Sequence, residues 1–111
     1  LPREDLLRLI EKQPFEFEPG EALIYNNSAY FLMGLIIEPV SRQSFEEYVD
    51  QNLFSPAGME NSSYCSNSAL VEQKAQGYQY SDEGLKLARY HDHTWPYAAG
   101  SLCSTISDRL A

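Results

Sequence analysis

The sequence predicts a mainly α-helical domain with one small β-hairpin, on three observations. Helix start and stop signals bracket several apolar stretches, of which the longest is the nine-residue run Ala29–Ile37. Strand-like alternation of apolar and polar residues is confined to residues 78–87. With 111 residues, of which 43% are hydrophobic and 13% aromatic, the chain is long enough for one domain with a core, but not for two. We therefore expect residues 1–111 to form a single domain.

The first helix is expected to begin at Pro2, because proline fits a first helical turn. The acids that follow it favour the positive end of the helix dipole. Pro14 ends the segment. Between the two prolines, the apolar residues that share one helical face are Leu6, Leu9 and Ile10.

The second helix is expected to begin near Asn27 or Ser28, since either side chain can cap it through its oxygen. It is apolar all round as far as Ile37, which predicts a place at the centre of the core. Pro39 marks its expected end. Gly34 costs about 1 kcal/mol relative to alanine inside a helix, so we expect it to permit close helix packing.

A third helix is predicted by Ser44 and Glu47, which match the two positions of a capping box. The turn at residues 55–58 ends this helix, and Met59 is expected to fold back beneath it. The residues of its apolar stripe are Phe45, Tyr48, Val49 and Leu53.

The second half of the chain is expected to be less regular. Residues 61–67 predict a polar loop and residues 91–100 an irregular segment, in which residues 95–97 are expected to form a packed anchor. Between them, alternation on both sides of a turn at residues 81–84 predicts a two-stranded hairpin. A short last helix is expected to be capped by Ser104 or Thr105.

Charge and hydropathy exclude several kinds of partner. The 16 acidic and 8 basic residues give a net charge of −8, and the acids are spread along the chain. Nucleic acid is therefore not expected as a partner, because binding phosphates requires a basic face. The longest apolar run is too short to cross a bilayer, so we expect no membrane segment. The sequence shows no targeting signal and does not assign a compartment.

The two cysteines and the two histidines are the residues that could form a disulfide or bind a metal ion. Cys65 and Cys103 are too few and too far apart in sequence to indicate a disulfide framework or a zinc site, so we expect free, partly buried thiols. His91 and His93 can present two imidazoles on one side of an extended segment. No third ligand stands nearby, and a mobile, solvated loop is favoured. We therefore expect neither a metal ion nor a cofactor.

The strongest functional motif lies between Phe17 and Tyr48. A Pro-Gly turn leads to the triplet Tyr25-x-Asn27, which places a phenol and a carboxamide at the start of the apolar helix. This triplet resembles the second catalytic motif of serine β-lactamases of the class C type and of related penicillin-recognising peptidases and esterases. The resemblance implies the helical subdomain of the α/β β-lactamase or transpeptidase-like fold.

Three further segments resemble the same family. Residues 55–59 are similar to its Pro-Leu-Gly-Met turn, and residues 76–78 to a Gly-Tyr strand start. Residues 99–108 are similar to its glycine-rich turn into a Ser-Thr-x-x-Asp helix. Among the departures, Arg42 stands where the family usually has glycine.

Two motifs of this family are absent from residues 1–111. One is Ser-x-x-Lys, which holds the nucleophilic serine, and the other is Lys-Thr-Gly or His-x-Gly, which helps to bind the substrate. The lysines are Lys12, Lys74 and Lys86, and none has a serine three residues before it. We therefore expect an internal segment of a serine hydrolase domain, catalytically inactive by itself.

The resemblance implies a role for each residue of the triplet. Tyr25 would take the proton of the serine hydroxyl together with the family's lysine. Since a free tyrosine has a pKa of about 10, nearby cations must favour the phenolate. Asn27 would position the amide of the substrate's acyl group. The alternatives are a core tyrosine at a helix start and an asparagine that only caps the helix.

The substrate class stays open, because the motif serves β-lactam hydrolysis, D-alanyl peptide cleavage and esterase action alike. We expect a small-molecule or peptidoglycan-like substrate in the complete protein. A different class of function is a non-catalytic interaction or sensor domain that binds peptidoglycan or another protein. Apolar surface on the helix 29–37 would favour self-association if it were left uncovered.

Overall fold

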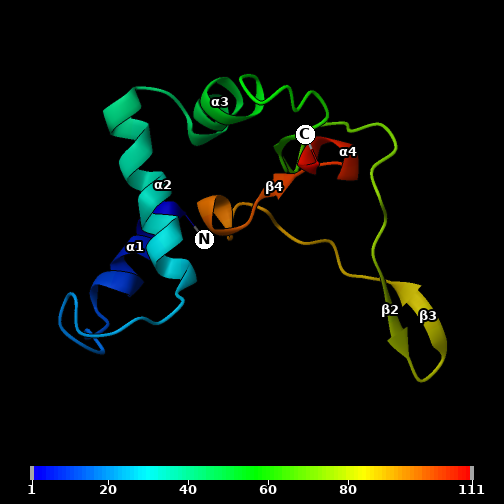
Figure 1. The fold of residues 1–111 in the computed structure, drawn as a ribbon. Helices are drawn as coiled ribbons and strands as arrows, with labels where there is room; N and C mark the ends of the chain where they lie inside the picture. The colour runs from blue at the N-terminus through cyan, green and yellow to red at the C-terminus, as the bar shows by residue number, and fades with distance from the viewer. Residues whose placement is uncertain (1, 111) are drawn as a thin grey trace.

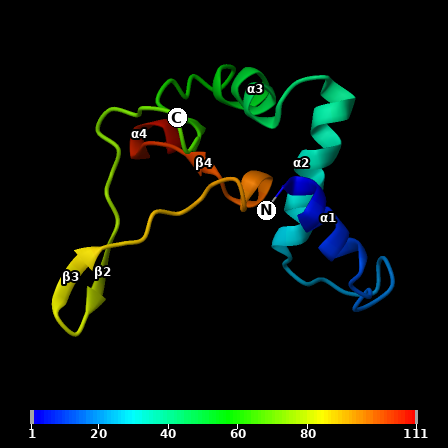
Figure 2. The same ribbon diagram turned by 180° about the vertical axis from the view of Figure 1, so that it is seen from behind.

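The computed structural model describes residues 2–110, and Figure 1 shows their arrangement. The helices of the first half of the chain lie at one side and along one edge of the molecule, and the hairpin of residues 78–87 projects away from them in both views (Figures 1 and 2). The expected helices and the hairpin are present, together with a second two-stranded sheet that the sequence did not predict. The elements in chain order are α1 (Arg3–Glu11), α2 (Asn27–Ser41), α3 (Phe45–Val49), η1 (Asp50–Phe54), β1 (Ser63–Tyr64), β2 (Tyr78–Ser81), β3 (Gly84–Leu87), η2 (Tyr97–Ala99), β4 (Leu102–Cys103) and α4 (Ile106–Arg109).

Helix α1 begins directly after Pro2, as predicted, and ends before Pro14. Leu6 and Ile10 pack against the core, whereas Leu9 is half exposed. None of the α1 residues is fully buried, so this helix covers the core from one side only. Within residues 2–110, no helix is long and apolar enough to cross a membrane.

Helix α2 is capped by Asn26, one residue before the expected position. The Asn26 side-chain oxygen, Oδ1, accepts hydrogen bonds from the backbone N–H groups of Ser28, at 2.7 Å, and Ala29, at 3.2 Å. Asn26 has extended backbone angles, which are typical of an N-cap residue. The prediction of Asn27 or Ser28 as the cap was wrong because three successive residues can all serve as caps. The Asn27 side chain is consequently not used to cap the helix.

The end of α2 also differs from the prediction. The helix continues through Pro39 to Ser41, because a proline in the last turn removes only one backbone hydrogen bond. Arg42 then adopts a left-handed conformation, with φ of 59°, and its N–H donates to the Glu38 carbonyl at 2.9 Å. A left-handed C-cap favours glycine, which fits the glycine usual at this position in the family that the sequence resembles.

Helix α2 is central on one face only. Phe31 and Gly34 are its buried residues, so the expectation of a helix surrounded by core was wrong for its other faces. No other helix or strand of residues 2–110 covers these faces. Self-association through them stays a prediction. The large apolar residues that α2 leaves exposed are Tyr30, Met33, Ile36 and Val40.

The core is formed mainly by aromatic rings around Tyr97, which is fully buried. The Tyr97 ring centroid lies 5.6 Å from that of Phe31 and 5.0 Å from that of Phe45. A Cβ atom on Gly34 would lie 2.5 Å from the Tyr97 ring and 2.6 Å from the Ala98 Cβ. The glycine therefore permits close packing, as predicted, and the element that it admits is the short helix η2.

Helix α3 begins with the predicted capping box. The Glu47 N–H donates to Ser44 Oγ at 3.2 Å, and the Ser44 N–H donates to Glu47 Oε2 at 2.9 Å. The π-helical turn η1 follows, and its wider winding brings Phe54 into the core in place of the predicted Leu53. Met59 folds back as expected, its N–H donating to the Phe54 carbonyl at 2.9 Å.

The predicted loop at residues 61–67 contains strand β1, which pairs antiparallel with β4. This pairing brings Cys65 and Cys103 together as a disulfide with a Cα–Cα distance of 5.3 Å, so the prediction of free thiols was wrong. Their separation of 38 residues in sequence gave no sign of contact, because strand pairing between two such short segments has little sequence signature.

The remaining elements follow the prediction closely. Strands β2 and β3 pair antiparallel from Tyr78 opposite Leu87 to Ser81 opposite Gly84. Helix α4 is capped by Thr105, whose Oγ1 accepts from the Asp108 N–H at 3.2 Å. The radius of gyration of 16.9 Å exceeds the value of about 13 Å expected for a compact chain of this length, because the hairpin stands apart.

Glu38 joins four parts of this fold. Its Oε1 accepts hydrogen bonds from Arg3 at 3.0 Å, from the Tyr97 hydroxyl at 2.6 Å and from the Phe45 N–H at 3.2 Å. The Arg3 guanidinium also lies 3.8 Å from the centre of the Tyr97 ring. Burial alone would raise the pKa of Glu38, but the hydrogen bonds from Tyr97, Phe45 and Arg3 lower it overall.

Glu38→Gln is expected to destabilise the chain by about 1–2 kcal/mol at pH 7, since a neutral amide replaces the acceptor of three hydrogen bonds. A lowered pKa stabilises the folded state above the unfolded value of about 4.3, and that stability is lost as the pH falls through the folded value. Urea unfolding at pH 7 and pH 3 should therefore show a smaller difference between wild type and variant at pH 3. Glu46→Gln, at an exposed position on α3, is the control, and an equal difference at both pH values would contradict this role of Glu38.

Asn26→Ala is expected to cost about 1 kcal/mol of stability, because two N–H groups at the start of α2 lose their acceptor. Asn27→Ala should change the stability by less than about 0.5 kcal/mol, as expected for an exposed residue without a cap role. The free energies of unfolding of the two variants, measured side by side, test the assignment. A larger loss for Asn27→Ala would show that the cap had been assigned to the wrong residue.

Candidate active site

Tyr25 lies immediately before the cap of α2, and its side chain is 73% exposed. Its ring centroid lies 5.7 Å from that of Tyr30, one turn into the helix. Within this chain, Tyr25 is therefore not a core residue. The phenol is held beside α2 by one aromatic contact and faces away from the core.

Asn27 lies in the first turn of α2 and lines a pocket of about 320 Å³. Because Asn26 is the cap, the Asn27 carboxamide is not needed for the helix, and the alternative of a purely capping role is wrong. Ser28 lines the same pocket, whereas Tyr25 is not among the lining residues. The apolar residues that α1 and α2 contribute to the wall are Leu6, Ile10 and Phe31.

The rest of the pocket wall comes from the segment His91–Ala99. His91 adds an imidazole, and Trp95, which is 45% exposed, adds an indole. The expected packed anchor at residues 95–97 is confirmed for Tyr97, which is buried, but not for Trp95, which is half exposed. Packing of η2 against α2 brings this segment to Asn27, a contact between distant parts of the sequence that no local motif indicates.

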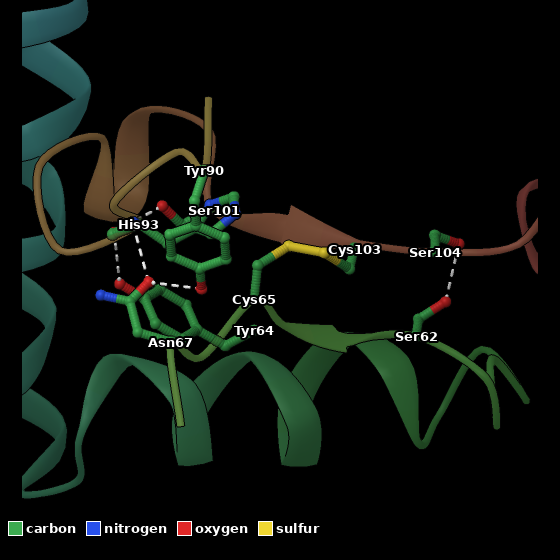
Figure 3. Close-up of a disulfide and its surroundings, with 9 residues drawn as sticks. All are labelled: Ser62, Tyr64, Cys65, Asn67, Tyr90, His93, Ser101, Cys103 and Ser104. Carbon is green, nitrogen blue, oxygen red and sulfur yellow. Dashed lines mark hydrogen bonds between the residues drawn. A yellow bond between two sulfur atoms is a disulfide. The ribbon is translucent and has the colours of Figure 1, made fainter. Parts of the chain in front are cut away.

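The segment around His93 is tightly hydrogen-bonded, not the mobile, solvated loop that the sequence favoured (Figure 3). The His93 carbonyl accepts from Ser101 Oγ at 2.7 Å, from the Tyr64 hydroxyl at 3.1 Å and from the Tyr97 N–H at 3.3 Å. The His93 N–H donates to Asn67 Oδ1 at 3.0 Å. These bonds connect the segment to β1 and to the start of β4, so its position is defined by distant residues.

The two histidines do not form a metal site with any third ligand in the described part of the chain. Their ring centroids lie 5.8 Å apart, and residues 2–110 contain no group of three potential ligands. Burial lowers the pKa of His93, and the charges of Lys74 and His91 lower it further. His93 is therefore a neutral imidazole at pH 7, fixed in place mainly through its backbone.

Taken together, these groups form a wall in which polar and apolar surface lie side by side. The Asn27 carboxamide can both donate and accept hydrogen bonds, and the apolar surface beside it can hold a side chain of a ligand. Tyr25 offers a phenol at the same helix start. A complete acyl-transfer site also requires a nucleophile paired with a base, and residues 2–110 contain no Ser-x-x-Lys sequence to provide it.

Sequence comparison extends the resemblance to the whole chain. The Beta-lactamase family model matches residues 1–111. The mouse mitochondrial serine beta-lactamase-like protein LACTB is 29% identical over 105 residues, which are 94% of this chain and 19% of LACTB. A putative D-alanyl-D-alanine carboxypeptidase of Escherichia coli is 36% identical over 53 residues, which are 48% of this chain and 12% of that protein.

Structural comparison agrees with this result. A penicillin-binding protein from Bacillus halodurans superposes with a TM-score of 0.82 at 34% identity, over 97% of this chain and 34% of that protein. The chain spans between 12% and 21% of the length of the first curated relatives that it matches. By sequence and by fold, the chain belongs to the Beta-lactamase family, within the superfamily of serine β-lactamases and penicillin-binding proteins.

Proposed function

We propose that this chain provides one wall of the active site of a serine hydrolase, which forms an acyl-serine intermediate from a β-lactam, a D-alanyl peptide or an ester. The observation that carries the proposal is the start of α2. There, Asn26 alone caps the helix, while Asn27 faces a pocket and Tyr25 stays exposed. Membership of the Beta-lactamase family supports the reaction class.

In this proposal Tyr25 is the catalytic residue of the chain. Its phenolate takes the proton of the serine hydroxyl as that oxygen attacks the carbonyl carbon, and then returns the proton to the leaving group. A phenol with a pKa of about 10 needs a neighbouring cation to do this at neutral pH. The lysine of a Ser-x-x-Lys motif in the complete protein would supply that charge.

Asn27 is the substrate-binding residue. Its carboxamide would hold the amide of the acyl group, which fixes the carbonyl carbon at the distance that the serine oxygen requires. The apolar wall of Leu6, Ile10 and Phe31 would cover the side chain attached to that acyl group. In this proposal side chains carry out the nucleophilic attack and the proton transfers, so it includes neither a metal ion nor a cofactor.

In the complete protein, Tyr25→Phe is expected to lower kcat by about 10²–10⁴-fold, the usual contribution of a general base. Asn27→Ala should lower kcat/KM by about 10-fold or more, as expected for the loss of one positioning hydrogen bond. Hydrolysis of a chromogenic cephalosporin and of a D-alanyl peptide measures both effects. Tyr30→Phe and Asn52→Ala, at exposed positions, are the matched controls.

The alternative of a non-catalytic interaction or sensor domain predicts a different outcome. A complete protein that binds labelled penicillin or peptidoglycan without turnover or acylation would contradict the proposal and support a binding module. The 111-residue chain itself is expected to be inactive, since it has no Ser-x-x-Lys sequence. A covalent penicillin adduct on this chain, detected by mass spectrometry, would contradict that part.

A further inference from the structure

We propose that Asn67 is a positioning residue, which with the Cys65–Cys103 disulfide fixes the His91–Trp95 segment as part of the binding wall shared with Asn27. Its kinetic consequence rests on the proposed acyl-transfer function. The positional consequence does not, because it concerns only the contacts of this chain.

Asn67 uses both ends of its carboxamide. Its Nδ2 donates to Asp92 Oδ1 at 2.6 Å, and its Oδ1 accepts from the His93 N–H at 3.0 Å and from the Tyr90 hydroxyl at 3.1 Å. All three partners are more than 20 residues away in sequence. One exposed side chain therefore holds three nearly consecutive residues of the segment. Figure 3 shows two of these partners, Tyr90 and His93, beside Asn67.

Asp92 extends this restraint toward Trp95. Its Oδ1 also accepts from the Thr94 hydroxyl at 2.6 Å and from the Thr94 N–H at 3.0 Å. The hydrogen bonds from Thr94, followed by that from Asn67, lower the pKa of Asp92 to about 2. Asp92 is thus ionised at neutral pH, and its bond with Asn67 is charge-assisted.

The disulfide fixes the segment after β1 that carries Asn67. Cys65 lies two residues before Asn67, and its N–H donates to the Ser101 carbonyl at 2.8 Å. Strands β1 and β4 have two residues each, so their own hydrogen bonds are too few to form a stable pair. The covalent bond to Cys103 supplies the missing restraint.

Hydrogen bonds hold the other end of this strand pair. Ser62 Oγ lies 2.7 Å from Ser104 Oγ and donates to the buried Asp108 carboxylate at 2.7 Å. Figure 3 shows the Ser62–Ser104 pair beyond the disulfide, on the side away from Asn67. Loss of the disulfide is therefore expected to release the Asn67 end first.

These restraints matter because His91 and Trp95 line the pocket with Asn27. Tyr25 and Asn27 belong to the start of α2, which Asn67 does not contact. Loss of Asn67 should therefore weaken ligand binding while leaving the chemical step intact. In kinetic terms KM rises and kcat stays nearly unchanged.

The decisive variant is Asn67→Asp in the complete protein. It keeps the acceptor for His93 and Tyr90 but places a second carboxylate against Asp92. The double variant Asn67→Asp/Asp92→Asn restores a donor and an acceptor with their places exchanged. Asn52→Asp, another exposed asparagine whose amide donates to a backbone carbonyl, is the control.

Two measurements report on the position of the His91–Trp95 segment and on its effect on ligand binding. Labelling with 5-fluorotryptophan gives a ¹⁹F resonance for Trp95, assigned by its loss in Trp95→Phe, and steady-state kinetics separates KM from kcat. Asn67→Asp is expected to shift or broaden that resonance and to raise KM by roughly 10-fold, as expected when repulsion replaces a charge-assisted hydrogen bond. The double variant should return the Trp95 resonance and KM toward their wild-type values. Asn52→Asp should change neither the resonance nor KM.

An unchanged Trp95 resonance in Asn67→Asp, or no recovery in the double variant, would overturn the proposal. An equal fall in kcat would also overturn it, because that would indicate an effect on the reacting groups. If the wild type hydrolyses no acyl substrate, the proposed function fails, yet the Trp95 resonance still tests the role of Asn67.

Reduction of the disulfide in the complete protein is expected to change the Trp95 resonance in the same direction as Asn67→Asp. Far-UV circular dichroism, recorded on the same samples, shows whether the helices persist. Cys65→Ser/Cys103→Ser, purified without reductant, should match the reduced wild type. A Trp95 resonance identical in oxidised and reduced protein would overturn the role assigned to the disulfide.

Discussion

The Glu38 carboxylate is the point at which the separate segments of this chain are joined. It accepts hydrogen bonds from α1 through Arg3, from the start of α3 and from the Tyr97 hydroxyl of η2. Gly34, one turn earlier in α2, leaves room for the Tyr97 ring. Because η2 is held against α2 in this way, the segment before it lies beside Asn27. The pocket therefore depends on this junction, although Glu38 itself does not line it.

The binding wall combines two kinds of restraint. The start of α2 is positioned locally, by the cap that Asn26 provides two and three residues ahead. The His91–Trp95 segment is positioned by distant partners on β1 and beyond, through Asn67 and the backbone of His93. A site built on the end of a rigid helix and on a segment fixed by hydrogen bonds is preorganised, which reduces the cost of ordering when a ligand binds.

Local signals in the sequence were sufficient for most elements. The capping box at Ser44, the cap at Thr105 and the hairpin depend on residues within a few positions of each other. The exact cap of α2 was missed by one residue, because adjacent asparagines cap equally well. The disulfide and the Asn67 contacts could not be predicted, since each joins residues more than 20 positions apart without a repeating pattern.

We propose that Asn26 alone caps α2, which leaves Tyr25 and Asn27 for the substrate. The most direct test is a crystal structure of the complete protein with an acyl group bound to its serine. We expect the Asn27 carboxamide within about 2.7–3.2 Å of the acyl amide and the Tyr25 hydroxyl at a similar distance from the serine oxygen. The proposal is contradicted if Asn27 caps the helix in that structure, or if Tyr25 remains against Tyr30 and away from the serine.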